Sequence, residues 1–144
     1  MKVKDIMTKD VIIANPTDSI LTVVKLMKHH NIGAIPVAEN AEKVLGMTTD
    51  RDIVLSLADF NFDLANTNAN KLMSNRVYSV RPEADLNSAL ALMKKQQIRR
   101  LPVIEEEKLV GMISIGDIAV RSGYMQEMSE AISEISYPSK VENL

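Results

Sequence analysis

Residues 46–52 read GMTTDRD, and residues 111–117 read GMISIGD. Both stretches follow one pattern: a glycine, an apolar residue, a variable residue, a hydroxyl residue, two variable residues and an aspartate. Each overlaps a short apolar run, Val44–Thr48 or Leu109–Ile113, that is long enough for a strand and too short for a helix. The sequence therefore places a glycine and a hydroxyl–aspartate pair at a strand-to-helix junction, twice in one chain.

The similarity of the two stretches extends over most of the chain. Met7 aligns with Met73, an offset of 66 residues, and after a one-residue gap Gly46 aligns with Gly111, an offset of 65. Other identical pairs follow the first offset at Val11, Pro16, Leu26, Met27, Ile32, Pro36 and Val37, and the second at Met47, Asp52 and Ile53. Such self-similarity indicates an internal duplication. We expect one repeat at 1–58, a connector at 59–66, a second repeat at 67–121, and a C-terminal helix and tail at 122–144.

Each repeat is predicted to contain a strand, a helix, two strands and a second helix. Apolar residues at helical spacing run from Ile20 to Met27 and from Leu86 to Met93. Ile32–Val37 reads as a strand with a proline next to its last residue, a position that tolerates the missing amide, and 98–103 repeats it. We expect an α/β (α+β) fold of two pseudo-symmetric units, each a small sheet with two packed helices.

The chain beyond the second repeat also has helical spacing. Its apolar positions are Tyr124, Met125, Met128, Ala131, Ile132 and Ile135, and Tyr137-Pro138 ends the pattern. Two interpretations stay open: a helix that packs on its own domain, or a helix that contacts another subunit.

Composition excludes several classes of function. The 144 residues include 46% apolar and 25% charged residues, as in one globular domain, and the scattered charges sum to −2, so a nucleic-acid partner is not expected. The absence of cysteine excludes disulfides and thiolate zinc sites. No signal peptide or membrane-spanning run is recognisable, and we expect a cytoplasmic protein with no membrane partner. His29 and His30 are adjacent, so they do not share a helical face, and no metal site is expected.

The hydroxyl–aspartate pairs have two compatible interpretations. A hydroxyl followed three residues later by an acid is a capping box, in which both side chains satisfy free backbone amides at a helix start. Alternatively, the carboxylate accepts two hydrogen bonds from a vicinal diol while the hydroxyl contacts sugar or phosphate.

These motifs resemble those of the cystathionine β-synthase (CBS) domain, present as a tandem pair of the stand-alone bacterial or archaeal type. The resemblance spans residues 1–121 and rests on Asp5-Ile6-Met7-Thr8, Ile35-Pro36-Val37, 45–53, Leu72-Met73-Ser74, Leu101-Pro102-Val103 and 109–118. It implies a disc-like module with two clefts. The ligands that it implies contain adenosine: AMP, ADP, ATP or S-adenosylmethionine.

The resemblance also assigns candidate binding residues. The ribose would be held by Thr49 with Asp52 and by Ser114 with Asp117. The residues that would line the base pockets are Ile12, Ile35, Pro36, Val37, Tyr78, Leu101, Pro102 and Val103.

Arg99-Arg100 breaks the symmetry between the repeats, because Gly33-Ala34 occupies the equivalent positions. The pair is either solvated or, as the resemblance implies, a phosphate contact. If Leu101 and Val103 face the core, Arg100 lies on the other face of the strand, so Arg100 is the stronger candidate. Arg51 is a further phosphate candidate, with a helix-surface role as the alternative.

We therefore expect a regulatory module that senses energy or metabolites by binding an adenine nucleotide and changing its conformation or its interaction with a partner. It would form a homodimer, regulate an unidentified protein and require no cofactor. The alternatives are a sensor of S-adenosylmethionine and a ligand-free scaffold for dimerisation. An enzyme is not expected, since no nucleophile, metal constellation or convergent acid–base pair is recognisable, and no catalytic residue is assigned.

Overall fold

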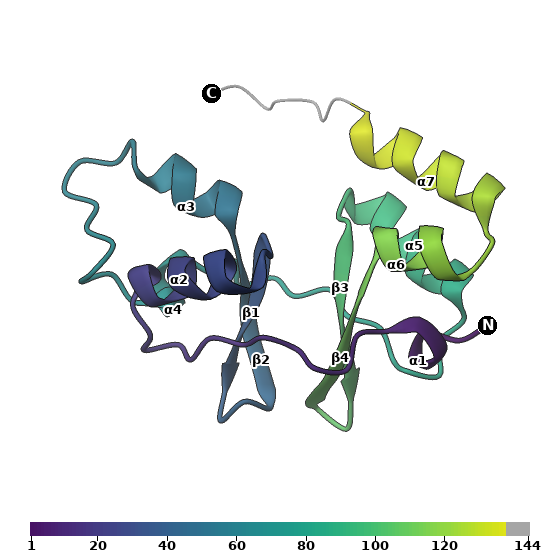
Figure 1. The fold of residues 1–144 in the computed structure, drawn as a ribbon, viewed down its shortest axis with the longest axis horizontal. Coiled ribbons are helices and arrows are strands. Elements are labelled where there is room, and N and C mark those ends of the chain that lie inside the picture. Colours follow the sequence, from purple (N-terminus) through teal and green to yellow (C-terminus); the bar gives the residue numbers. More distant parts are fainter. Residues whose placement is uncertain (138–144) are drawn as a thin grey trace. The chain divides into compact units, whose positions relative to one another are not determined.

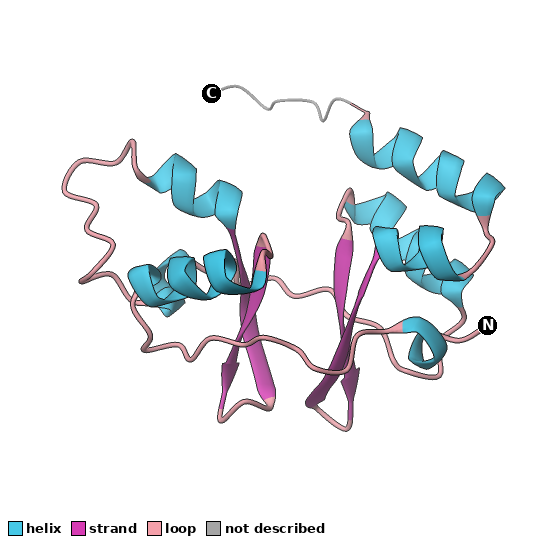
Figure 2. Ribbon diagram, viewed as in Figure 1, coloured by secondary structure: helices cyan, strands magenta, loops and turns pink. Residues whose placement is uncertain are grey.

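The computed structural model describes residues 1–137, which form two compact units (Figure 1). The first-repeat unit comprises Asp10–Val77 with Glu106–Leu109, and the second-repeat unit comprises Met1–Lys9, Tyr78–Glu105 and the chain from Val110 onward. Each unit combines an antiparallel pair of strands with helices (Figure 2), which confirms the mixed α/β class. None of the described helices is long and apolar enough to cross a membrane.

The first-repeat unit is built around one hairpin. Its elements are α2 (Ile20–His30), β1 (Ala34–Glu39), β2 (Lys43–Thr49), α3 (Asp50–Ser56) and α4 (Ala69–Leu72). Ser19 caps α2 by accepting the Thr22 amide, and Asn31 ends it in the left-handed conformation. The periodic face of α2 packs on the sheet in a core that consists of Ala14, Ile20, Val23, Met27, Ile35, Val37, Ile53 and Ala69.

The second-repeat unit repeats this plan and adds elements at both ends. Its elements are α1 (Val3–Ile6), α5 (Leu86–Gln96), β3 (Arg100–Glu105), β4 (Lys108–Ser114), α6 (Ile115–Arg121) and α7 (Met125–Ser136). The helix α7 packs on α5 and α6, and its Met128 and Ala131 are buried in the unit's core. The tail helix thus packs on its own domain; the predicted stop at Pro138 lies outside the described residues.

The repeated glycine allows a neighbouring segment to approach the hairpin closely. A Cβ at Gly46 would lie 2.3 Å from the Ser74 carbonyl oxygen, and one at Gly111 would lie 2.7 Å from Met7 Sδ. At each point a single antiparallel bridge joins the segment to the strand, Met47 to Ser74 and Thr8 to Met112. A side chain at Gly46 would displace the bridge to Ser74, whereas one at Gly111 would first displace the Met7 side chain.

The strand expected at the start of each repeat is reduced to a single bridge, so this part of the prediction was wrong. Ala14 donates to the Pro36 carbonyl at 3.0 Å and accepts from the Ala38 amide at 2.9 Å, but pairing goes no further. Val80 bridges Val103 in the same way. The prolines two residues later, Pro16 and Pro82, have no amide with which to continue a ladder.

The short helix at the start of each sequence repeat packs in the compact unit of the other repeat. The Val3 amide donates to Ala84 O at 2.9 Å, and Val3 and Ile6 are buried in the second-repeat core. In turn the Ala69 amide of α4 donates to Asp18 O at 2.7 Å in the first-repeat unit. A sequence repeat and a compact unit are therefore different divisions of this chain.

Candidate ligand sites at the strand-to-helix junctions

The first junction joins β2 to α3 at Thr49. Thr49 pairs with Ala34 across the hairpin and is the residue that caps α3, where its Oγ1 accepts the Asp52 amide at 3.2 Å. The half-buried Asp52 carboxylate accepts no hydrogen bond from any described residue. Both of its oxygens are thus available for a diol at this junction.

The second junction joins β4 to α6 at Ser114 and forms a complete capping box. Ser114 Oγ accepts the Asp117 amide at 3.1 Å, while Asp117 Oδ2 accepts from both the amide and the hydroxyl of Ser114 at 2.8 Å. The capping interpretation thus describes this junction fully, and it leaves Asp117 Oδ1 without a partner among the described residues.

A backbone hydrogen bond places the Arg99-Arg100 segment beside the second junction. The Ile115 amide donates to the Arg99 carbonyl at 2.9 Å, and Arg100 begins β3, the strand paired with β4. Leu101 and Val103 are fully buried in the core while Arg100 is exposed, as strand alternation required. The backbone of the arginine pair therefore lies beside Ser114 and Ile115, and both arginine side chains are exposed.

The eight residues predicted to line base pockets fall into two groups. Six are buried in the unit cores or strands: Ile35, Pro36, Val37, Leu101, Pro102 and Val103. Ile12 and Tyr78 are half-buried and pack at the edges of the two cores. These two side chains offer more surface to a ligand than the buried six.

Arg51 and Asp50 occupy the first turn of α3. Arg51 is exposed, and its amide donates to Asp50 Oδ1 at 2.8 Å. The sequence interpretation did not use Asp50, which aligns with Ile115 of the second repeat. The repeat alignment could have shown it, because Asp50 against Ile115 is a further difference in charge between the two junctions.

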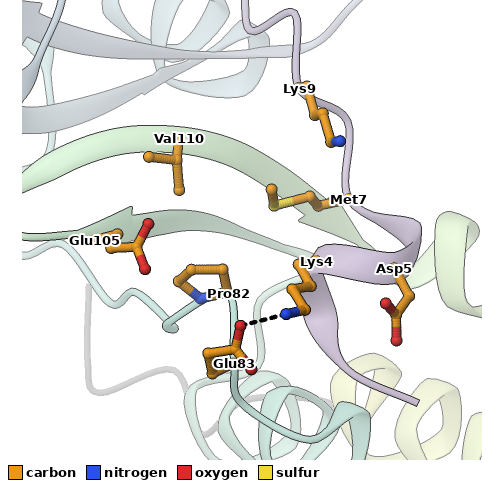
Figure 3. A pocket seen from close by; sticks show the side chains of 8 residues that line it. All are labelled: Lys4, Asp5, Met7, Lys9, Pro82, Glu83, Glu105 and Val110. Carbon is orange, nitrogen blue, oxygen red and sulfur yellow. Dashed lines mark hydrogen bonds and ion pairs between the residues drawn. The ribbon is translucent and has the colours of Figure 1, made fainter.

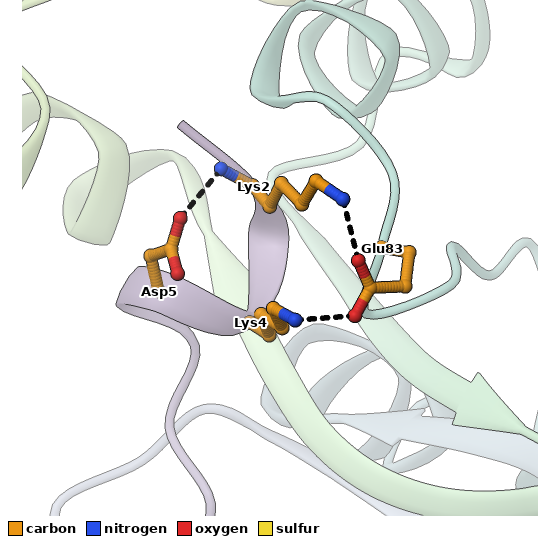
Figure 4. Close-up of polar contacts among 4 residues, drawn as sticks. All are labelled: Lys2, Lys4, Asp5 and Glu83. Carbon is orange, nitrogen blue, oxygen red and sulfur yellow. Dashed lines mark hydrogen bonds and ion pairs between the residues drawn. The ribbon is translucent and has the colours of Figure 1, made fainter.

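A separate polar pocket of about 410 Å³ lies in the second-repeat unit away from these residues (Figure 3). Its lining residues are Lys4, Asp5, Met7, Lys9, Pro82, Glu83, Glu105 and Val110. At its edge Glu83 lies between Lys2 and Lys4, at 2.6 and 2.5 Å (Figure 4). Hydrogen bonds from Lys2 and Lys4 lower the pKa of Glu83 to about 2, and the bond to Glu83 raises the pKa of Lys4.

Comparison with known proteins identifies the repeats. The CBS domain family matches residues 3–59 and again residues 69–122. The chain belongs to the CBS domain family. Within residues 1–137, no cluster of three or more histidine, aspartate or glutamate side chains could hold a metal ion.

Relatives of similar length are also CBS proteins. The chain is 39% identical over 135 residues to the CBS domain-containing protein YhcV of Bacillus subtilis, covering 94% of this chain and 95% of that protein. It is 34% identical over 116 residues to Hypoxic response protein 1 of Mycobacterium tuberculosis, covering 81% of each.

Solved CBS structures show the same fold. Hypoxic Response Protein I with two coordinated zinc ions superposes with a TM-score of 0.77 at 32% identity, covering 84% of this chain and 98% of that one. The CBS domain pair of protein MJ0100, in complex with 5′-methylthioadenosine and S-adenosyl-L-methionine, superposes with a TM-score of 0.74 at 26% identity, covering 83% and 94%. A hexameric CBS-CP12 protein from cyanobacteria superposes at 0.75 with 28% identity, covering 88% and 74%.

Proposed function

We propose that this CBS pair is a regulatory module that binds adenosine-containing ligands at its two strand-to-helix junctions. AMP, ADP, ATP and S-adenosylmethionine are the candidate ligands. Binding changes the populations of the module's conformations, and a partner protein responds to that change. The module needs no catalytic cofactor and catalyses no reaction of its own.

One observation carries the proposal. A half-buried aspartate with at least one oxygen unpartnered among the described residues lies beside a capping hydroxyl at both junctions, Thr49 with Asp52 and Ser114 with Asp117. A carboxylate that accepts both hydroxyls of a ribose forms charge-assisted hydrogen bonds, which are stronger than neutral ones. The complex of the MJ0100 pair with two adenosine derivatives supports this ligand class.

With the ribose placed at these hydroxyl–aspartate pairs, the base and phosphate contacts are assigned as follows. Ile12 and Tyr78 contact the base. The buried residues around Pro36 in β1 and Pro102 in β3 lie behind them. Arg100, with Arg99 beside it, contacts a phosphate at the second junction. Arg51 is the phosphate candidate at the first junction for any phosphorylated ligand that binds there.

We further propose that the protein is a homodimer. Large apolar side chains lie exposed on α3 and just beyond it: Val54 at 62%, Leu55 at 56%, Leu57 at 57% and Phe60 at 94%. Exposed large apolar side chains that lie this close in the sequence are a candidate interaction surface in a soluble protein. Because most homo-oligomers have closed symmetry, a twofold dimer is the simplest assembly that covers it.

The ligand-free scaffold is the second candidate, favoured by the complete capping box at Ser114, which explains the Ser114 and Asp117 side chains without a ligand. Thermal melting separates the two functions. A ligand that binds only the native state stabilises it by about 2.7 kcal/mol at a hundredfold excess over its dissociation constant. At least one of AMP, ADP, ATP and S-adenosylmethionine should raise the melting temperature at millimolar concentration; if none does, the scaffold is correct. Light scattering gives the subunit count in the same samples.

A further inference from the structure

The two junctions differ in charge at two pairs of equivalent positions. The first has Gly33 and Asp50, and the second has Arg99 and Ile115. The backbones correspond, because the Asp50 amide donates to Gly33 O and the Ile115 amide donates to Arg99 O, both at 2.9 Å. The first junction therefore has a carboxylate that the second lacks, and the second has a guanidinium group where the first has glycine.

Gly33 and Asp50 are packed so closely that a residue like Arg99 cannot join them without a change. A Cβ at Gly33 would lie 2.8 Å from Asp50 Oδ2 and 3.2 Å from its Cγ. Gly33 has a φ that other residues also adopt, so a larger residue at this position would require the Asp50 carboxylate to move. The second repeat removes the same conflict by having Ile115 in place of the acid.

We propose that the two sites select different adenosine derivatives by charge. The first site, with Asp50, takes a derivative whose 5′ substituent is neutral or cationic, such as a thioether or sulfonium nucleoside. The second site, with Arg99 and Arg100, takes a derivative whose 5′ substituent carries phosphate. This inference rests on the proposed function, because it specifies the ligand of each site.

The charge balance within each site supports the assignment. Arg51 is the one cation of the GMTTDRD motif, and it is flanked by Asp50 and Asp52, so the first-site motif has a net charge of −1 (+1 − 2). The second site has Arg99, Arg100 and Asp117, a net charge of +1 (+2 − 1). A phosphate meets attraction in the second site and net repulsion in the first, and a sulfonium meets the reverse.

Calorimetry with three ligands that share adenine and ribose but differ in charge at the 5′ position tests the proposal. 5′-Methylthioadenosine has no charge at its 5′ position, S-adenosylmethionine has a sulfonium there, and ATP has a triphosphate. We expect 5′-methylthioadenosine to bind with two equivalents per chain. ATP and S-adenosylmethionine should each bind one equivalent tightly and a second equivalent only weakly, and a mixture should fill both sites.

Two variants that change the charge of the first site test the role of Asp50. Asp50→Asn keeps the shape and the bond to the Arg51 amide but removes the charge, so the second equivalent of ATP should bind about fivefold more tightly, with 5′-methylthioadenosine unchanged. Gly33→Arg with Asp50→Ile installs the second-repeat pair in the first site. This double variant should bind two equivalents of ATP and should lose its site for S-adenosylmethionine.

The outcomes separate this inference from the function on which it rests. If 5′-methylthioadenosine does not bind at all, the adenosine sites themselves are wrong. If it binds twice, but ATP and S-adenosylmethionine also each bind twice with similar affinity, the sites exist and charge selection is wrong. Should the double variant fail to fold, Asp50→Asn decides: unchanged affinity for all three ligands overturns the role of Asp50.

Discussion

The side-chain amide of Gln97 donates to the backbone carbonyls of both Glu134 and Tyr137, at 3.2 Å each. Gln97 ends α5 in the left-handed conformation and precedes Arg99 by two residues, so it ties the end of α7 to the segment that enters β3. Gln97→Asn tolerates the same backbone conformation but is too short to reach both carbonyls. We expect faster amide hydrogen exchange in the last turn of α7, with exchange in α5 unchanged. Equal exchange in the variant and the parent would show that this contact does not hold α7.

The packing of α7 predicts a contrast between two of its apolar residues. Met128 is 5% exposed in the second-repeat core, whereas Ile132 is 50% exposed on the same helix. Met128→Ala should lower the free energy of unfolding by about 2–5 kcal/mol, as for other buried methionines. Ile132→Ala is the matched control and should cost less than about 1 kcal/mol, since half of its side chain remains in water. Denaturant unfolding measures both; equal costs would mean that α7 is not seated as described.

The Glu83 contacts predict a dependence of stability on pH. Lys2 and Lys4 lower the pKa of Glu83 from 4.5 to about 2, so folding favours its ionised form. This contribution is present above pH 4.5 and is lost as the pH falls toward 2, where the folded protein also protonates the group. The difference in stability between the parent and Glu83→Gln should therefore be constant at neutral pH and shrink across this range. Glu107→Gln, an exposed change without an ion pair among the described residues, should show no such convergence.

The sequence predicted those features that depend on local periodicity. The spacing from Ile20 to Met27 matches the buried face of α2, and the alternation at Leu101 and Val103 correctly left Arg100 exposed. Nothing local indicates that α1 packs in the second-repeat unit, because four residues have too little pattern to show a long-range contact. The first strand of each repeat is reduced to a single bridge because Pro16 and Pro82 have no amide to continue the pairing, and the predicted order of elements did not include this effect.

The candidate sites were predictable in position but not in detail. The duplicated motif located both hydroxyl–aspartate pairs, yet a capping box and an open carboxylate have the same sequence spacing. Only the structure distinguishes Asp117, which closes the box, from Asp52, which does not. The importance of Asp50 likewise depends on its close packing against Gly33, which no motif describes.

This difference between Asp52 and Asp117 predicts different costs for the same substitution. Asp117→Asn weakens two hydrogen bonds to Ser114 and should lower stability by about 0.5–1 kcal/mol, whereas Asp52→Asn should leave it nearly unchanged. Both substitutions should weaken adenosine binding at their own site, because an amide is a poorer acceptor for a ribose diol than a carboxylate. Thermal melting and calorimetry on the same samples provide the comparison. Loss of stability at both sites with no change in binding would mean that the two aspartates serve only as caps.

Arg100→Ala distinguishes phosphate binding from sugar binding at the second junction. The Arg100 side chain is exposed at the start of β3, so its removal should leave the melting temperature almost unchanged. Because a guanidinium pairs with phosphate and not with ribose, the variant should bind ATP or AMP about tenfold more weakly and adenosine as well as the parent does. Lys95→Ala, which removes another exposed cation from the same unit, controls for the general loss of positive charge. If both variants weaken ATP equally, or if Arg100→Ala weakens adenosine as much as ATP, then Arg100 does not contact the phosphate.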